Sequence, residues 1–487
     1  MTRETCPVWA LRKSEHLAAR VAVRAATRLA RVRRLLAAPD LRTMAPAATP
    51  LLHVLSAMLR RMPVAGRRRV LHGPDLRGFL TEVETWTTIA RAAAVARPGS
   101  GRSTRERPDR RMLTLFDKIS RTEHLVLLAP QGRIDAGLAG RAARHARRRL
   151  REVVDDLAAF ILGLRLAGAD GPDFAAHLAF RADPEQGRPG NRIDLGTIVG
   201  PAGPIGLVAP GASRVHVRAG FRTITLRRRG GAAVVLPAGP ALGLAIGMEH
   251  AAGPRPRPAG AVIVRRATVP GSPIVLAPAV RCHPRRLFVA GPLPGAGPRL
   301  ARALRLVQIA WPEAHREILL RTRLVVPVVE PGTVSWSIAA RPGVSFINLR
   351  GKTTVDLADD LLHETAHHHL HDRQEVEDLL RHGPDTEEVQ AFDSPWRGTR
   401  RPLHGILHGA FTFTFRAELF RRLLHARRAH PRVVGPLLAS RSPAWIRSEI
   451  RREDRMVAAA VRDLDRAARE GLLTSRGRRL VRAMRRG

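Results

Sequence analysis

The motif His363-Glu364-Thr365-Ala366-His367 is the part of the sequence whose residue types and spacing could do chemistry. Residues four apart lie on the same face of an α-helix, so a helix here would offer both imidazoles to one metal ion, with Glu364 beside them. Five of the protein's 20 histidines lie between residues 361 and 371. A solvated, histidine-rich helix face is therefore the alternative explanation.

The residues around the motif predict an amphipathic helix. Thr353 and Asp356 have the spacing of a capping box, which marks a helix N-terminus. Apolar residues then recur at helical intervals: Val355, Leu357, Ala358, Leu361, Leu362 and Ala366. This pattern places the motif inside a helix and favours a metal site over a solvated face.

Two imidazoles do not decide the reaction, because zinc peptidases and mononuclear iron enzymes both use them. The third ligand discriminates between them. His404 and His408 repeat the four-residue spacing, so a helix there could direct either one at the metal. Glu387 or Glu388 would fill the place of a glutamate ligand about 20 residues after the motif, unless both belong to a solvated acidic loop.

The charge of the chain is strongly positive, with 83 Lys and Arg against 42 Asp and Glu, a formal net charge of +41. Only three of these cations are lysines, at positions 13, 118 and 352, and tyrosine is absent. Such a skew is typical of a GC-rich coding sequence, so it argues only weakly for nucleic acid. A basic nucleic-acid-binding protein with a degenerate metal site remains an alternative.

The cysteine content and the hydropathy predict a cytoplasmic protein. Cys6 and Cys282 cannot form a disulfide framework, so a reducing compartment is expected. Met1 to Leu17 lacks the apolar core of a secretory signal. Gly230 to Met248 is uncharged, but two prolines and five glycines argue against a membrane-spanning helix. We therefore expect no membrane contact.

The periodicity of apolar residues predicts an α+β protein of several packed units. Its four expected parts are a helical N-terminal region (1–180), a small strand-rich middle (181–299), a catalytic metal-binding core with a sheet-supported helix (300–410), and a helical C-terminal region (411–487).

Individual elements are predicted within these parts. The expected helices are Glu15–Ala38, Leu51–Arg61, Leu76–Ala96, Ala139–Ala167, Leu300–Ala310, Ala314–Thr322, an extension or restart over Glu375–Arg381, and Trp445–Glu470. The expected strands are Val215–Val217, Thr223–Leu226, Ala261–Val264, Ile274–Leu276, Leu324–Val329, Val334–Ile338 and Val344–Leu349. Arg97–Arg111 is expected to be a loop, and Arg227–Gly231 a basic hairpin tip.

A series of short motifs follows in one order after residue 300. They are Trp311-Pro312-Glu313-Ala314, Ser335-Trp336-Ser337, Leu362-His363-Glu364-x-x-His367, Ser394-Pro395-Trp396-Arg397, Arg401-Pro402-Leu403-x-Gly405-x-Leu407-His408-Gly409 and Gly471-Leu472-Leu473-Thr474-Ser475-x-Gly477. Together they resemble the HExxH-type peptide-modification family of ribosomal peptide natural-product pathways. The resemblance covers about residues 300–487 and is weak before them. Ala366 departs from the glutamine that relatives often have.

The resemblance implies a bacterial enzyme that uses iron(II) and 2-oxoglutarate to hydroxylate a β-carbon in a ribosomally synthesised precursor peptide. Some relatives are associated with radical SAM enzymes that crosslink the same peptide. Carried over by position, His363 and His367 become metal ligands and His408 becomes the third. Arg397 and Arg401 match the family's two arginines.

The expected roles of these residues are chemically coherent. A forked guanidinium suits the distal carboxylate of 2-oxoglutarate, a role for Arg397 or Arg401. Ser335 and Ser337 are candidates for a hydrogen bond to the cosubstrate or the peptide. Glu364 separates the alternatives, because in a zinc peptidase it would be the base that activates water, whereas in an oxygenase it would orient a ligand or bound water.

Two further groups of residues have expected roles. His368, His369 and His371 are expected to be non-ligands, since they point around the helix. His371, however, continues the face of His363 and His367 one turn later, so it stays an alternative ligand. Trp311 and Trp396 are expected in the core.

Overall fold

The computed structural model describes residues 6–95, 136–181, 192–195, 205–208, 214–220, 223–228, 233–237, 247–248, 262–283, 286–381, 391–439 and 441–485. It has an α+β fold with helical N- and C-terminal regions and several small sheets, as the sequence predicted. The expected loop Arg97–Arg111, the last residues of the hairpin tip at 229–231, and Glu387 and Glu388 lie outside the described residues.

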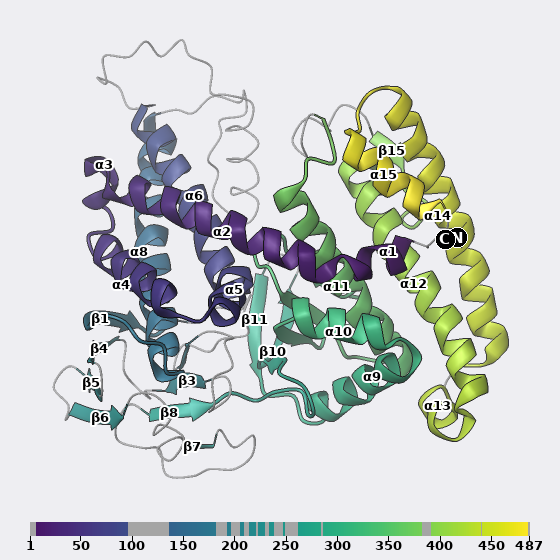
Figure 1. Cartoon of the computed structure of the whole chain (residues 1–487), viewed down its shortest axis with the longest axis horizontal. Helices are drawn as coiled ribbons and strands as arrows, with labels where there is room; N and C mark the ends of the chain where they lie inside the picture. Colours follow the sequence, from purple (N-terminus) through teal and green to yellow (C-terminus); the bar gives the residue numbers. More distant parts are fainter. Residues whose placement is uncertain are drawn as a thin grey trace.

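The N-terminal body consists of helices packed on two small sheets (Figure 1). Its helices are α2 (Ser14–Ala37), α3 (Pro39–Arg42), α4 (Ala48–Arg61), α5 (Val64–His72), α6 (Pro74–Val95) and α8 (Ala136–Leu166). The four helices expected here are confirmed as α2, α4, α6 and α8. In α8, Ala146, Leu150, Val153 and Leu157 are buried at helical intervals and pack toward the same core.

Both sheets of the N-terminal body are short. The first has the order β1-β4-β5-β6 and is antiparallel throughout, with β1 (Phe174–Ala179), β4 (Arg214–Ala219), β5 (Thr223–Arg228) and β6 (Ala233–Pro237). The second has the order β2-β3-β8-β7, with β2 (Arg192–Asp194), β3 (Ile205–Val208), β7 (Gly247–Met248) and β8 (Val262–Arg265). The strands predicted at 215–217, 223–226 and 261–264 are confirmed as β4, β5 and β8.

The C-terminal body is built on a sheet of order β11-β10-β12-β14-β13, with β9 beside β12. Its strands are β9 (Val275–Leu276), β10 (Ala279–His283), β11 (Arg286–Gly291), β12 (Leu324–Val328), β13 (Trp336–Ser337) and β14 (Val344–Asn348). Every residue of β12 and β14 is buried, which explains why β12 is a continuous apolar run. β14 also buries two polar side chains, Ser345 and Asn348. β13 pairs antiparallel with β14 at the edge of the sheet.

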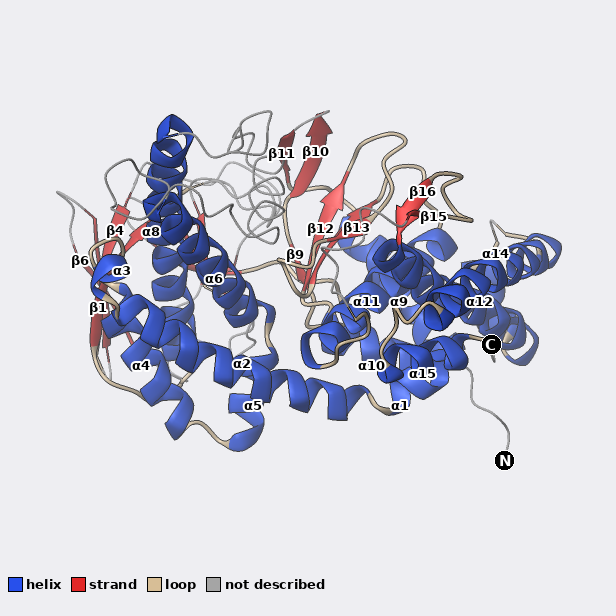
Figure 2. Cartoon of the chain, turned by 90° about the horizontal axis from the view of Figure 1, so that it is seen from above, coloured by secondary structure: helices blue, strands red, loops and turns tan. Residues whose placement is uncertain are grey.

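Helices cover this sheet and continue to the C-terminus. They are α9 (Ala296–Ala310), α10 (Pro312–Arg321), α11 (Thr354–Val376), α12 (Leu403–Ala429), α13 (Pro431–Leu437), α14 (Pro443–Arg469) and α15 (Ser475–Met484), with α1 (Cys6–Arg12) beside them. Figure 2 shows the sheet on one side of α9, α10 and α11. A hairpin of β15 (Ala391–Asp393) and β16 (Arg400–Pro402) leads directly into α12.

The motif helix α11 is central to the C-terminal body. It packs against α9, α10, α12 and β14, and also against α2 of the N-terminal body. The predicted capping box is present: the Asp356 amide donates to the Thr353 hydroxyl, and the Thr353 amide donates to the Asp356 carboxylate at 2.9 Å. The predicted domain boundaries stay a prediction. The boundary at residue 410 falls inside α12, whose two halves share one core.

The predicted helix over 375–381 is wrong. α11 ends at Val376, and Glu377 already has extended backbone. Leu380 instead pairs with Leu473, and the Thr474 amide donates to the Leu379 carbonyl. A long-range backbone pairing therefore overrides the local helical pattern.

No helix among the described residues is long and apolar enough to cross a membrane.

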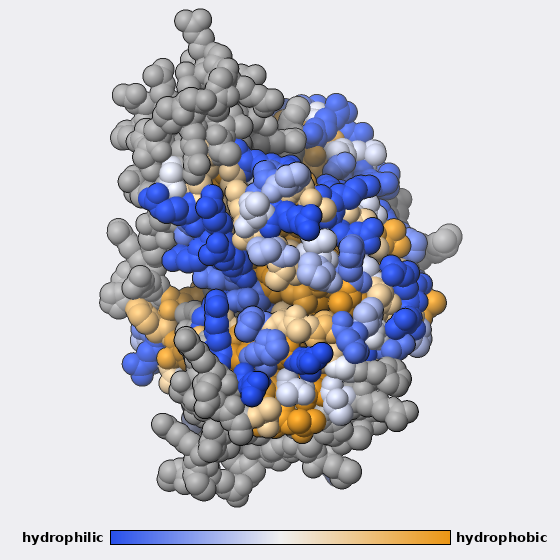
Figure 3. Space-filling model, turned by 90° about the vertical axis from the view of Figure 1, so that its left-hand side faces the viewer, coloured by the Kyte–Doolittle hydropathy of each residue, from blue (hydrophilic) through white to orange (hydrophobic). Residues whose placement is uncertain are grey.

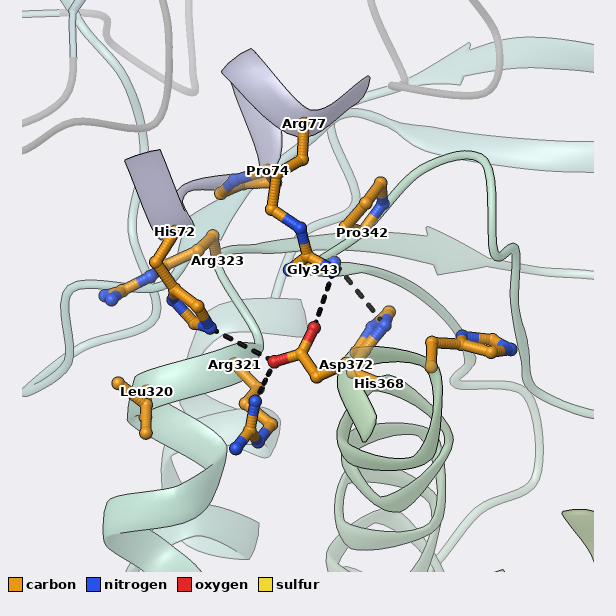
Figure 4. A pocket seen from close by; sticks show the side chains of 11 residues that line it. His72, Pro74, Arg77, Leu320, Arg321, Arg323, Pro342, Gly343, His368 and Asp372 are labelled. Carbon is orange, nitrogen blue, oxygen red and sulfur yellow. Dashed lines mark hydrogen bonds and ion pairs between the residues drawn. The ribbon is translucent and has the colours of Figure 1, made fainter. Parts of the chain in front are cut away.

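Buried ion pairs join the two bodies at the C-terminal half of α11. Asp372 accepts from His72 at 3.1 Å, contacts Arg77 at 2.6 Å and pairs with Arg321 (Figure 4). Its side chain is 3% exposed. His72 and Arg77 belong to α5 and α6, whereas Arg321 ends α10, so Asp372 connects three elements far apart in the sequence.

The network continues on both sides of Asp372. Glu317 pairs with Arg321, lies 2.6 Å from Nδ1 of His369, and accepts from the Ser14 hydroxyl of α2. At the end of α11, Glu375 binds Arg77 at 2.6 Å and Arg28 at 3.0 Å. The N-terminal body thus fixes the position of the helix that carries the motif.

We expect Asp372→Asn to lower the free energy of unfolding by about 3–5 kcal/mol, because it leaves buried guanidinium groups without their counter-charge. Urea denaturation measures the change. Asp170→Asn is the matched control, since Asp170 pairs with Arg61 at 3.4 Å with both side chains about half exposed. It should cost about 0–1 kcal/mol. Equal losses in the two variants would contradict the role given to Asp372.

The network also predicts that stability falls in acid. Burial and the cations of Arg77 and Arg321 hold the pKa of His72 well below its ordinary 6.5. Burial alone would raise the pKa of Glu317, but Arg321 and His369 outweigh it and hold that pKa well below its usual range. In both cases the unfolded chain binds more protons, below about pH 6.5 for His72 and below about pH 4.5 for Glu317.

The urea midpoint should therefore decrease as the pH is lowered from neutral, each such group contributing up to about 1.4 kcal/mol per pH unit. His72→Asn should make the decrease between about pH 7 and pH 5 shallower. A midpoint that rises over this interval would be inconsistent with a buried, neutral His72.

Candidate metal centre

A row of imidazoles runs along the face of α11 that meets α12. His363, His367 and His371 are spaced by one helical turn, and each is half-buried. α12 contributes His404, which is half-buried, and His408, which is 7% exposed. The two helices pack along their length because Leu361, Leu362, Leu403, Ile406 and Leu407 share one apolar core.

His367 of α11 and His408 of α12 meet through their ring nitrogens. Their Nδ1 atoms lie 3.1 Å apart, although 41 positions separate them in the sequence. The other ring nitrogen of His408, Nε2, lies 3.1 Å from the side-chain oxygen of Gln374 on α11. The fold therefore brings His367 of the HExxH motif against the later histidine that the resemblance implies as third ligand.

The spacing of the rings fits a shared metal ion for one pair of imidazoles and not for the other. Two imidazoles on one ion have centroids roughly 4.5–5.3 Å apart, given metal–nitrogen distances of about 2.0–2.1 Å. The centroids of His363 and His367 are 4.9 Å apart, within this range, whereas those of His367 and His408, at 5.4 Å, lie just outside it. Among the described residues, however, no three His, Cys, Asp or Glu side chains converge so as to hold one ion. Metal binding would therefore require at least one imidazole to turn.

The electrostatics of the row also fit a metal ligand set. Burial, followed by the neighbouring His404, lowers the pKa of His367 to about 4. Burial likewise holds the pKa of His363 and of His408 well below the ordinary value, with neighbouring histidines adding to the effect. These imidazoles are neutral near pH 7, which is the form that binds metal ions.

The three remaining histidines of the motif helix have different environments. His368 hydrogen-bonds with the Ser345 hydroxyl at 3.1 Å, and His369 with Glu317 at 2.6 Å, so both are held by the protein itself. His371 instead lies beside His408, with ring centroids 5.0 Å apart, and its buried Nδ1 has no hydrogen-bond partner among the described residues. Its spacing of four from His367 was the sequence feature that could have placed it in the row.

Glu364 lies on the side of α11 that faces β13 and is 2% exposed. Burial raises the pKa of its carboxyl group to about 8, although the neighbouring Ser337 hydroxyl opposes this. Both Oε2 of Glu364 and the Ser337 hydroxyl oxygen lack a hydrogen-bond partner among the described residues. Buried polar groups are normally paired, so this place is suited to a water molecule or a ligand.

Ser335 is already engaged within the protein. Its hydroxyl donates to Asp360 of α11 at 2.7 Å and accepts from the Asn348 amide of β14 at 3.0 Å. These bonds tie the edge of the sheet to the motif helix. Of the two serines that the sequence proposed for ligand binding, Ser337 is the one with an unpaired hydroxyl.

The two candidate arginines lie at the hairpin before α12. Arg397 is exposed in the turn that joins β15 to β16, and Arg401 is partly exposed in β16. Burial, and next the nearby cation of Arg397, lowers the pKa of Arg401. Within the described part of the chain, neither guanidinium has a hydrogen bond or an ion pair. Two neighbouring cations without counter-charges suit an anionic ligand.

Trp396 connects the hairpin to the histidine row. Its ring stacks on Phe413 of α12, with centroids 4.5 Å apart and planes 7° apart, and its Nε1 donates to Glu453 of α14 at 3.0 Å. Phe413 in turn lies against His363, with ring centroids 4.9 Å apart. Trp311 is 1% exposed and stacks on Phe415, so its predicted place in the core is confirmed.

No protein-family model matches the chain, and no curated protein sequence matches it. A functional assignment therefore depends on the ordered motifs and on the arrangement of these side chains.

Gly409→Ala should destabilise the protein by about 1–3 kcal/mol, because the added Cβ would lie 2.9 Å from the Trp396 ring. Thermal unfolding measures the loss, and tryptophan fluorescence should report the displaced ring. Gly405→Ala is the control one turn earlier, where the nearest atom is the Arg401 Cβ at 3.5 Å. If both substitutions were neutral, the packing of Trp396 on α12 would be wrong.

Proposed function

We propose that the chain binds a divalent metal ion through His363, His367 and His408 and acts as an iron(II)- and 2-oxoglutarate-dependent peptide β-hydroxylase. The observation that supports this most directly is the meeting of α11 and α12, where the His367 and His408 Nδ1 atoms lie 3.1 Å apart. The ordered motifs after residue 300 resemble a family with this chemistry and assign the same three histidines.

When bound, iron(II) and 2-oxoglutarate would supply the oxidising chemistry that acts on a carbon–hydrogen bond. The chain's own part is to hold the three neutral imidazoles on one side, which leaves the remaining coordination positions to cosubstrate and oxygen. Arg397 or Arg401 would bind the distal carboxylate of 2-oxoglutarate, since both guanidiniums lie free of carboxylate partners in the described structure.

Glu364 would position water or a ligand next to the metal. Burial raises the pKa of its carboxyl group to about 8. A cation bound beside it would lower that pKa and favour the carboxylate, whose oxygens accept hydrogen bonds. Ser337 adds a hydroxyl at the same place. Glu364 and Ser337 would set the orientation of this water or ligand, as polar neighbours of metal ligands commonly do.

The proposed substrate is a ribosomally synthesised precursor peptide in the bacterial cytoplasm, and a radical SAM enzyme is a candidate pathway partner. This part of the proposal is supported by the resemblance alone.

A zinc peptidase that processes such a peptide is the second candidate, and Glu364 favours it. Its Oε2 has no hydrogen-bond partner among the described residues, so the ionised carboxylate would be available as the base for water activation. The two candidates differ in the product: hydroxylation adds one oxygen atom to an intact peptide, whereas peptidase action cleaves a backbone bond.

The test is incubation of purified protein with iron(II), ascorbate, 2-oxoglutarate, oxygen and a precursor peptide encoded by a neighbouring gene. We expect succinate and a peptide heavier by one oxygen atom, measured by mass spectrometry. His367→Ala should lower turnover on the order of a hundredfold or more, because a metal ligand is lost.

The matched control is His425→Ala, at an exposed position on α12, which should leave turnover unchanged. Peptide fragments formed with zinc, and lost in Glu364→Gln, would replace the hydroxylase by the peptidase. If neither the hydroxylated peptide nor peptide fragments form, both candidate functions are refuted.

A further inference from the structure

A groove of about 530 Å³ lies on the N-terminal body, away from the histidine row. It lies between α8 and the ends of β1 and β4. Its lining residues are Arg144, Arg147, Arg148, Arg151, Glu152, Asp155, Ala179, Arg181 and Arg214. Six arginines thus face two carboxylates, which makes the groove strongly positive. Figure 3 shows the side of the molecule that includes α8, where hydrophilic side chains cover much of the described surface.

Four of the six arginines have no ion pair among the described residues: Arg214 and three arginines of α8, whereas Arg148 pairs with Glu152 at 3.8 Å. Arg181 is already paired with Asp155 and Asp156, at 3.5 Å and 2.8 Å. Exposed Arg144, Arg147 and Arg151, by contrast, have no ion pair or side-chain hydrogen bond within the described part of the chain. Like charges gathered without partners repel one another, so an anionic ligand would stabilise this face.

The spacing of these arginines suits an extended polypeptide. They lie at positions i, i+3 and i+7 of α8, so they span roughly 10 Å along one face of the helix. An extended chain rises about 3.3 Å per residue, so two or three of its residues cover this length. Carboxylates on alternate residues of such a chain can each meet a guanidinium, which binds them with two parallel hydrogen bonds.

The sheet beside the groove also suits a peptide. β1 is the edge strand of its sheet, paired with β4 on one side and with no second strand among the described residues. Ala179, its last residue, lines the groove. An extended peptide can therefore hydrogen-bond to the open edge while its acidic side chains reach α8.

Nucleic acid fits the groove less well. No lining residue is aromatic, so bases have no side chain on which to stack. Glu152 and Asp155 place carboxylates among the lining arginines, and these would repel a backbone with a negative charge at every nucleotide. A peptide, in contrast, can have acidic residues opposite the arginines and uncharged residues opposite the two carboxylates.

We propose that this groove, which we call the α8 arginine groove, binds an acidic segment of a polypeptide. If the proposed function holds, the natural ligand is an acidic stretch of the precursor peptide, held far from the residue to be modified. The binding itself depends only on the groove residues and needs neither metal nor cosubstrate.

The test measures binding of a fluorescein-labelled peptide of alternating glycine and glutamate to the full-length chain by fluorescence anisotropy at low ionic strength. We expect binding that weakens as salt is added. A triple variant with Arg144→Gln, Arg147→Gln and Arg151→Gln should bind roughly tenfold more weakly or worse, because three charge contacts are lost. A peptide with glutamine in place of glutamate should not bind.

The matched control is Arg447→Gln, Arg451→Gln and Arg455→Gln, three exposed arginines on α14 that remove the same charge elsewhere. It should bind like the wild type, and melting curves should show both variants folded. The proposal is overturned if the groove variant binds like the wild type, if both variants weaken equally, or if single-stranded oligothymidylate of equal charge displaces the peptide as effectively.

The binding test and the turnover test fail separately. A chain that binds the acidic peptide but makes no succinate keeps the groove and refutes the hydroxylase, whereas turnover with no loss of affinity in the groove variant refutes the groove.

Discussion

The buried carboxylate of Asp372 is the contact on which the arrangement of the whole molecule depends. A charge removed from water is tolerated only when opposite charges and hydrogen bonds replace its hydration, and here α5, α6 and α10 each supply a partner. Asp372 follows His371 directly, so the same contacts that join the two bodies also set the rotation and height of the motif helix. The N-terminal region therefore acts on the candidate site without contributing a side chain to the histidine row.

The two sides of α11 differ in how their polar groups are satisfied. On one side, His368, His369 and Asp372 are hydrogen-bonded within the protein, although the buried Nε2 of His369 has no partner among the described residues. On the other side, His363, His367 and His371 are half-buried and face α12. Toward β13, the Oε2 atom of Glu364 lacks a hydrogen-bond partner in the described structure. The hydrogen bonds on the first side fix the position of α11, so the histidines on the second side are presented to α12 in a fixed direction.

Periodicity and capping were sufficient to predict most of the fold. α2, α4, α6, α8, α9 and α14 are confirmed because each buries an apolar stripe at helical spacing, and α11 begins at its predicted capping box. The prediction over 375–381 is wrong because local pattern cannot register a backbone pairing with Leu473. For the candidate site, the ordered motifs predicted which histidines could be metal ligands. They could not predict the contact of His371 with His408 or the hydrogen bonds of His368 and His369, because these partners are distant in sequence.

The sequence by itself determined which histidines recur at helical spacing, because residues four apart on a helix share a face whatever surrounds them. Only the tertiary structure decided which imidazoles meet, since the contact between His367 and His408 results from the packing of α11 on α12. The tertiary structure also decided which charges pair. Of the 80 arginines, some bind Asp372 and Glu375 and others line the α8 arginine groove, and the two groups differ only in their position in the fold. Burial and proximity, which no local pattern encodes, give identical side chains different roles.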